Sequence, residues 1–110
     1  RMRDFYFHQK RSYRDYGPQT DQPWKSINSE IKTININNGI TTIGSFAFFE
    51  FRNLVYVNIP NSITSIGNNA FLNCTSLKYI NIPKSVTYIG NSTFENCFSL
   101  VSIIIPNASI

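Results

Sequence analysis

Apolar and polar positions follow a fixed pattern in residues 54–76, and the pattern returns in the same order every 23 residues. Val57 and Ile59 alternate with polar or aromatic neighbours, as expected of a strand with one buried face. Pro60 comes next and should end that strand, because proline has no N–H group to donate to a neighbouring strand. Each repeat is therefore predicted to begin with a short strand.

The second part of the repeat is predicted to bring the chain back toward its starting point. Ile63 and Ile66 supply the apolar positions of this return. Gly67 is expected at a turn that needs a backbone conformation which other residues resist. Residues 69–74, Asn-Ala-Phe-Leu-Asn-Cys, are expected to form a short helical or 3₁₀ turn that places Phe71 over the interior.

The pattern occurs without insertion in residues 31–53, 54–76 and 77–99, and a partial copy occupies 100–110. Equivalent residues form columns along the copies: Gly44, Gly67, Gly90; Ile43, Ile66, Ile89; Phe48, Phe71, Phe94; Pro60, Pro83, Pro106. A period of 20–29 residues that opens Leu-x-x-(Val/Ile)-x-Ile is typical of a leucine-rich-repeat solenoid. One copy cannot bury its own apolar face, so successive coils must stack. We therefore expect a β-rich repeat solenoid of 23-residue coils, with short parallel strands and short helical or 3₁₀ turns.

The motif L-x-x-(V/I)-x-I-P-x-x-(I/V)-T-x-I-G-x-x-A-F-x-N-C-x-S, found over residues 31–106, resembles the BspA-type (Treponema pallidum-type) leucine-rich repeat. The Ile-Gly, Ala-Phe and Asn-Cys pairs stand at the spacing of that family. Three positions depart from it: Asn37 replaces Pro, Phe51 replaces Cys, and Thr93 replaces Ala. The resemblance implies a cell-surface or secreted, adhesin-like protein of a bacterium or a parasitic protist.

Residues 1–30 lack the repeat and are expected to form an aromatic, basic capping segment over the first coil. Residues 1–14 hold five basic residues and one acidic residue, which gives 5 − 1 = +4, the whole net charge of the chain. Such an arm also suits nucleic acid or an anionic surface, although no RNP-like, helix-turn-helix or zinc pattern supports nucleic-acid binding. The expected cap consists of Met2, Phe5 and Trp24, covering Ile34, Ile36 and Phe48.

The sequence offers little to a catalytic or metal site. His8 is the only histidine, the six acidic residues are scattered, and the glycines do not form a phosphate-binding loop. One histidine and two cysteines do not supply the four ligands of a structural zinc site. No apolar run approaches the ~18 residues of a membrane-spanning helix. We expect a protein without enzymatic activity, cofactor, metal or transmembrane segment. Arg1 precedes Met2, so we also expect a fragment or a processed product.

Cys74 and Cys97 occupy the same column of the repeat and should lie one coil apart. Adjacent strands are ~4.8 Å apart and disulfides need Cα atoms roughly 4.4–6.8 Å apart, so the spacing permits a bridge. Stacked side chains, however, run parallel instead of toward each other. The alternative is two buried thiols that act as small apolar side chains.

The outward positions of the predicted strands form a candidate binding face, because solenoids bind ligands on such surfaces. Tyrosine and asparagine on it provide contact area at little entropic cost. The candidate residues are Tyr56, Asn58, Lys78, Tyr79, Asn81 and Ile104. The leading hypothesis is a protein-binding module whose ligand lies on this face. The alternatives are a solvated sheet with laddered asparagines, and a structural segment that self-associates through its C-terminal edge at Leu100, Ile103 and Ile105.

Overall fold

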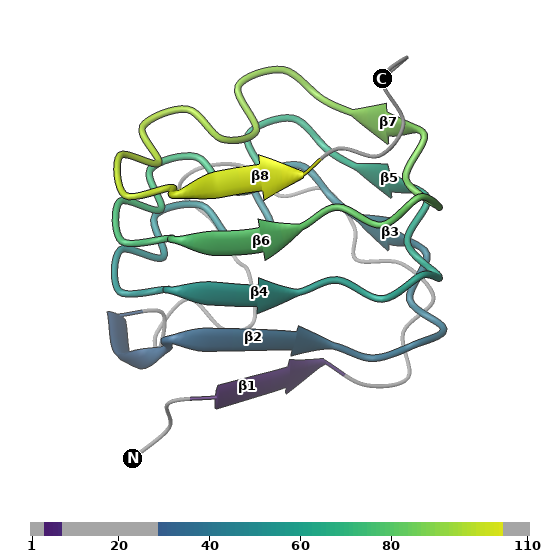
Figure 1. The fold of residues 1–110 in the computed structure, drawn as a ribbon, viewed down its shortest axis with the longest axis horizontal. Helices are drawn as coiled ribbons and strands as arrows, with labels where there is room; N and C mark the ends of the chain where they lie inside the picture. Colours follow the sequence, from purple (N-terminus) through teal and green to yellow (C-terminus); the bar gives the residue numbers. More distant parts are fainter. Residues whose placement is uncertain (1–3, 8–28, 105–110) are drawn as a thin grey trace.

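The chain winds into stacked coils that build two parallel sheets, one of five strands and one of three (Figure 1). The computed structural model describes residues 29–104 and the backbone of residues 4–7. The five-stranded sheet has the order β1 (Asp4–Phe7), β2 (Thr33–Ile36), β4 (Tyr56–Asn58), β6 (Tyr79–Asn81) and β8 (Ser102–Ile104). The three-stranded sheet has the order β3 (Thr42–Ile43), β5 (Ser65–Ile66) and β7 (Tyr88–Ile89).

Strand pairing follows the sequence repeat. Thr33 pairs with Tyr56, Tyr56 with Tyr79, and Tyr79 with Ser102, in parallel throughout. The predicted β-rich repeat solenoid with parallel strands is therefore confirmed. The sequence predicted one strand per coil, and the structure has a second, two-residue strand in each of the three full copies.

β1 comes from the segment that lacks the repeat and extends the five-stranded sheet ahead of the first coil. It pairs with β2 in parallel, and Asp4 lies opposite Thr33. The side chains of Met2, Phe5 and Trp24, which were expected to cover the first coil, lie outside the described residues. The expected cap therefore stays a prediction.

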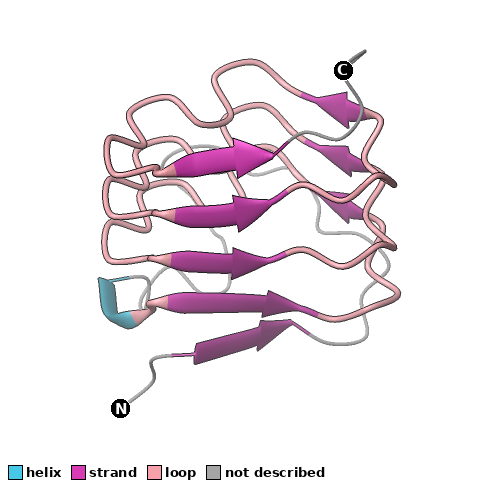
Figure 2. Ribbon diagram, in the orientation of Figure 1, coloured by secondary structure: helices cyan, strands magenta, loops and turns pink. Residues whose placement is uncertain are grey.

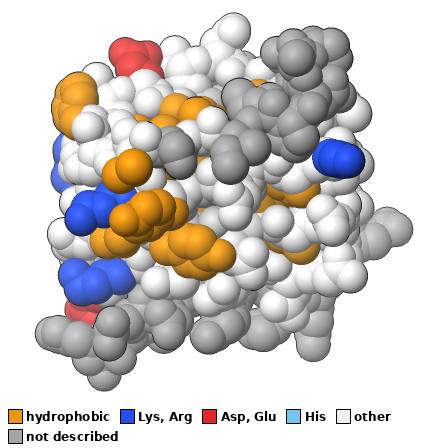
Figure 3. All heavy atoms as spheres, viewed as in Figure 1, with side chains coloured by type: hydrophobic (Ala, Val, Ile, Leu, Met, Phe, Trp, Pro, Cys, Tyr) orange, Lys and Arg blue, Asp and Glu red, His pale blue; other side chains and the backbone are white. Residues whose placement is uncertain are grey.

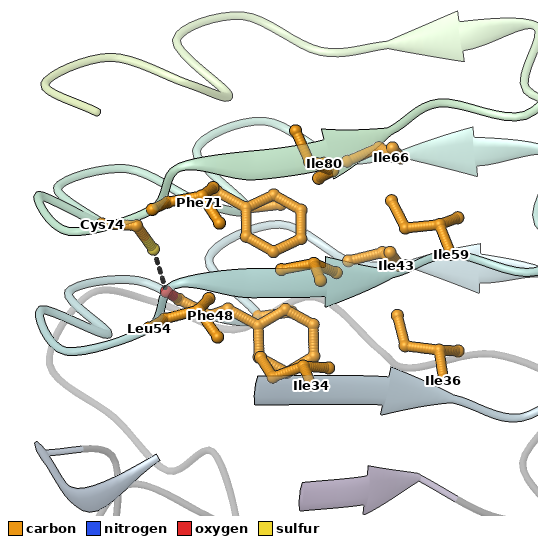
Figure 4. Close-up of a cluster of buried hydrophobic side chains, with 14 of the residues drawn as sticks. Ile34, Ile36, Ile43, Phe48, Leu54, Ile59, Ile66, Phe71, Cys74 and Ile80 are labelled. Atoms are coloured by element: carbon orange, nitrogen blue, oxygen red, sulfur yellow. Dashed lines mark hydrogen bonds between the residues drawn. The ribbon is translucent and has the colours of Figure 1, made fainter. Parts of the chain in front are cut away.

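The core fills the space between the two sheets and contains columns of equivalent residues (Figure 4). Ile34, Val57 and Ile80 point inward from the large sheet and are at most 2% exposed. Phe71 stacks on Phe48 and Phe94 in the neighbouring coils, with ring centroids 5.4 and 5.7 Å apart. Each coil thus buries its apolar face mainly against the next coil, which is why a single copy cannot stand alone.

The segment predicted as a helical or 3₁₀ turn is a run of successive turns without helix, a correction to the sequence-based prediction (Figure 2). In residues 69–74, the N–H groups of Asn69, Phe71 and Asn73 donate to carbonyls of the next coil at 2.9–3.0 Å. The N–H groups between them donate three residues back. Asn69 and Asn73 have positive φ angles of 60° and 64°. The left-handed residues direct alternate N–H groups toward the next coil. The hydrogen bonds that these groups form connect neighbouring coils.

Gly67 is required for a different reason from the one its place at a turn suggested. Among the described glycines only Gly39 has a positive φ, of 107°. A Cβ atom on Gly67 would lie 2.6 Å from the backbone nitrogen of Ser45 and 2.8 Å from the carbonyl carbon of Gly44. The glycine therefore allows the backbones of two coils to approach closely at this column.

Candidate binding face

The outer side of the five-stranded sheet, here called the strand face, carries three columns of side chains. The tyrosine column has Thr33, Tyr56 and Tyr79; the asparagine column has Asn35, Asn58 and Asn81; the flanking column has Lys32, Val55, Lys78 and Val101. Hydrophobic side chains gather on this face beside lysine or arginine side chains (Figure 3). The inward positions between these columns are buried in the core, so the pleat of the sheet divides each strand into an outer and an inner set.

Tyr56 and Tyr79 lie on neighbouring strands, and the register makes their Cα atoms direct partners. Their exposed fractions are 37% and 51%, so the core does not account for these two aromatic residues. Parallel strands lie ~4.8 Å apart, which brings the two phenol rings into one continuous surface. The structure therefore brings together the two tyrosines that the sequence indicated.

The flanking column reaches the face because the strands begin with shared hydrogen bonds. The N–H groups of Lys78 and Tyr79 both donate to the carbonyl of Val55, at 2.9 and 3.2 Å. Those of Val55 and Tyr56 both donate to the carbonyl of Lys32 in the same manner, at 2.8 and 3.2 Å. The shared carbonyl marks the place where regular strand pairing begins, so the strict alternation of side chains within the strands does not extend to the flanking column. Consecutive residues Lys78 and Tyr79 are consequently both exposed.

Two members of the asparagine column carry exposed amides, whereas Asn35 is half-buried. Asn58 and Asn81 are exposed, and within the described part of the chain no side-chain hydrogen bond joins them. Asparagines do form ladders in the turn segment, where Asn96 Nδ2 donates to Asn73 Oδ1 at 2.8 Å. Ile104 pairs with Asn81 in the register, but its side chain lies outside the described residues. Five of the six predicted face residues are thus described and exposed on one surface.

Phe98 is an exposed apolar residue that the predicted face did not include. It is 78% exposed and lies just ahead of Val101, which is 68% exposed. The equivalent positions in the other two full copies are polar: Arg52 and Thr75. A phenylalanine in an otherwise polar column was the signal in the sequence that could have drawn attention to it.

Both cysteines are free, buried thiols in the core. The Sγ atom of Cys74 donates to the carbonyl oxygen of Phe48 in the preceding coil at 3.2 Å (Figure 4). The Sγ atom of Cys97 donates in the same way to the carbonyl oxygen of Phe71, also at 3.2 Å. Burial raises the pKa of both thiols above the ordinary value. For Cys74 the neighbouring Cys97 raises the pKa further. Protonated, hydrogen-bonded thiols are structural and unreactive.

Over residues 29–104, no three His, Cys, Asp or Glu side chains converge to hold a metal ion. The same part of the chain has no helix that is long and apolar enough to cross a membrane. Most of the basic segment 1–14 lies outside the described residues, so binding of nucleic acid or an anionic surface by that segment stays a prediction.

Comparison with known families places the chain in a defined class of repeat protein. Residues 26–110 match the BspA-type leucine-rich repeat region, in six copies. The match covers most of the chain, and the coils, parallel strands and stacked columns agree with it. The chain therefore belongs to the BspA-type leucine-rich repeat family.

Three solved bacterial structures resemble this fold. A leucine-rich repeat protein from Eubacterium ventriosum is 25% identical, with a TM-score of 0.71 over 83% of this chain and 30% of its own. A leucine-rich cell-surface protein from Faecalibacterium prausnitzii is 33% identical, with a TM-score of 0.60 over 68% of this chain and 20% of its own. The leucine-rich repeat protein of T. pallidum is 23% identical, with a TM-score of 0.52 over 71% of this chain and 47% of its own. At this identity the likeness supports the fold alone.

The chain thus spans about a third or less of the length of the first two of these proteins. A comparison with curated protein sequences finds no match.

Proposed function

We propose that this chain is a non-enzymatic, protein-binding leucine-rich repeat module of a cell-surface or secreted, adhesin-like protein, with the ligand on the strand face. The observation that carries the proposal is the pair of exposed tyrosines, Tyr56 and Tyr79, on neighbouring strands. Membership of the BspA-type family and the likeness to the cell-surface protein of F. prausnitzii support the location.

A binding role explains features of the strand face that folding does not require. Parallel sheets usually have both faces covered, yet this sheet leaves large aromatic side chains exposed. Tyrosine combines a large apolar ring with a hydroxyl group and has few rotatable bonds, which favours it at protein interfaces. The exposed amides of Asn58 and Asn81 add hydrogen-bonding groups beside the rings.

The experiment that tests this function is selection of peptides from a phage-displayed library of linear peptides on the immobilised chain. Peptides enriched on the wild-type chain would be synthesised and their affinities measured for the double variant Tyr56→Ala/Tyr79→Ala. We expect at least a tenfold loss of affinity, because buried interface tyrosines commonly contribute more than ~1 kcal/mol each.

Tyr88→Ala is the matched control for this experiment. Tyr88 lies in β7 of the other sheet and is 53% exposed, so its removal deletes a similar surface ring away from the strand face. Peptides that bind the double variant and the wild-type chain equally well would contradict the proposed face. Circular dichroism would check that each variant keeps the fold.

A second candidate function, assembly through the C-terminal edge, is favoured by one observation. Ile89, Phe94, Leu100 and Ile103 pack against the core but are only partly buried. Light scattering over a wide concentration range tests this function: reversible association that Ile103→Lys abolishes and Val101→Lys retains would support it. A monomer at every concentration would contradict it.

A further inference from the structure

We propose that the strand face binds an extended polypeptide segment with acidic side chains. This inference rests on the protein-binding function proposed above and names the chemistry of the partner. Three features of the face support it: the sign and placement of its charges, their spacing, and the apolar surface between them.

The charged side chains described in the three columns of the face are Lys32 and Lys78. Both are exposed, and neither forms an ion pair with another described residue. Arg52, at the corner that precedes β4, is instead paired with Glu50 at 3.0 Å. The two lysines therefore present positive charge that the described part of the chain leaves without a counter-charge.

Acidic residues lie away from Lys78, whereas Glu30 is two positions before Lys32 and Asp4 is in the strand next to β2. Glu30, Glu50 and Glu95 belong to none of the three columns, since they precede the strands or lie in the turn segment. The register places Asp4 in line with the tyrosine column, but in β1, three strands from Tyr79. An anionic partner would consequently meet no described acidic side chain beside Lys78.

The spacing of the two lysines fits an extended chain that runs along the stack of coils. β2, β4 and β6 are consecutive in the sheet, so Lys32 and Lys78 lie two strand spacings apart, about 10 Å at ~4.8 Å each. An extended polypeptide in the polyproline II conformation advances ~3.1 Å per residue with three residues per turn, so acidic residues three positions apart lie on one side of it and span about 9 Å. Such a segment can meet both ammonium groups at once.

Apolar surface lies between and beyond the lysines. Val55 separates them in the flanking column, and Tyr56 and Tyr79 lie alongside. Beyond Lys78 in the flanking column is the exposed side chain of Val101. A partner that covers these side chains would exclude water near Lys78 and strengthen its attraction to a carboxylate. The face therefore favours an acidic segment that also carries apolar or aromatic residues.

The peptide selection provides the test, with the sequences of the enriched peptides as the first readout. We expect enrichment of aspartate and glutamate three residues apart, together with aromatic or aliphatic residues. Affinity of a synthesised peptide should fall at least fivefold for Lys78→Glu and for Lys32→Glu. It should also fall when ionic strength rises from about 0.01 to about 0.15 M, which shortens the screening length from ~30 to ~8 Å.

Lys84→Glu is the matched control, because Lys84 is exposed, lies outside the three columns and changes the net charge equally. The inference is overturned if the enriched peptides carry no excess of acidic residues, or if Lys84→Glu weakens binding as much as Lys78→Glu. Peptides that depend on Tyr56 and Tyr79 but are neutral would overturn this inference alone. Acidic peptides that bind independently of both tyrosines would overturn the proposed function, and this inference with it.

Discussion

At some positions of this chain, the short distance between neighbouring coils restricts the residue type as much as the local turn does. A side chain on Gly67 would collide with the backbone of residues 44–45, and one on Gly90 would meet the backbone and side chain of Asn68. Backbone atoms cannot rotate aside as a flexible side chain does, so the coils would have to separate. The glycine column therefore sets how closely successive coils pack.

Substitution of Gly67 by alanine should destabilise the fold more than the same change at Gly39. Gly67→Ala should lower the free energy of unfolding by about 3 kcal/mol, because the added methyl group forces the backbones apart. Gly39→Ala should cost about 1 kcal/mol, because open space surrounds Gly39 and only its positive φ resists a side chain. Urea denaturation measures both values, and equal losses would contradict the close-approach explanation.

The buried cysteines should make stability fall in alkaline solution. The pKa of the Cys74 thiol is raised in the folded chain, so unfolding above about pH 8.5 releases a proton. Stability should be independent of this group below about pH 8 and fall above it, by up to ~1.4 kcal/mol per pH unit. Urea denaturation from about pH 7.5 to about pH 10 measures the slope, and Cys74→Ala should flatten it. An unchanged slope would contradict the assignment.

At the scale of elements, the turn segments hold the coils together and position the aromatic column. Their alternate N–H groups reach the next coil, so the segments behave like additional strands of irregular conformation. Asn69, Asn73 and Asn96 hold three of the six left-handed positions found among the described non-glycine residues, and asparagine tolerates this conformation better than most residues. This geometry places the Phe48, Phe71 and Phe94 rings in a stack.

Replacing the middle ring of the stack, Phe71, should destabilise the fold more than replacing the last described ring, Phe94. Phe71 is fully buried between two rings, whereas Phe94 is only partly buried and stacks on one described ring. Phe71→Leu should cost about 1.5 kcal/mol of folding free energy and Phe94→Leu about half of that. Thermal or urea denaturation measures the difference. The leucine variants are preferred to alanine, which would remove about 3–5 kcal/mol and unfold much of a small domain. Equal losses would show that the end of the stack is as constrained as its middle.

At the scale of the whole molecule, stability depends on contacts between neighbouring coils. Residues 54–76 lie between two full coils, while residues 77–99 have one full coil on one side and the partial copy on the other. Repeat proteins of this kind can open from an end, because each unit contacts only its neighbours.

Amide hydrogen exchange should therefore differ between equivalent positions. The N–H groups of Gly67 and Gly90 donate to the matching carbonyls of Ile43 and Ile66, at 2.7 and 2.9 Å. We expect the Gly67 amide to exchange at least about tenfold more slowly, because its coil is held from both sides. NMR or mass spectrometry measures the two rates. Identical rates would mean that the described coils open as one cooperative unit.

The sequence by itself determined the period, the β-rich solenoid and the outward columns of the face. These follow from local alternation in Val57 and Ile59 and from exact spacing along three copies, since residues at equal positions must stack when coils repeat. Five of the six predicted face residues could be placed for this reason. The sequence did not decide whether Cys74 and Cys97 form a disulfide bridge or remain two buried thiols.

Only the tertiary structure decided the features that arise between coils. The left-handed residues replace the expected helical turn because alternate N–H groups find carbonyls in the next coil, not in their own. Gly67 is needed for a backbone that lies 23 residues away, at Gly44. Lys78 joins Tyr79 on the face because two N–H groups share the carbonyl of Val55. Each depends on contacts between segments far apart in the chain, and local sequence patterns do not encode such contacts directly.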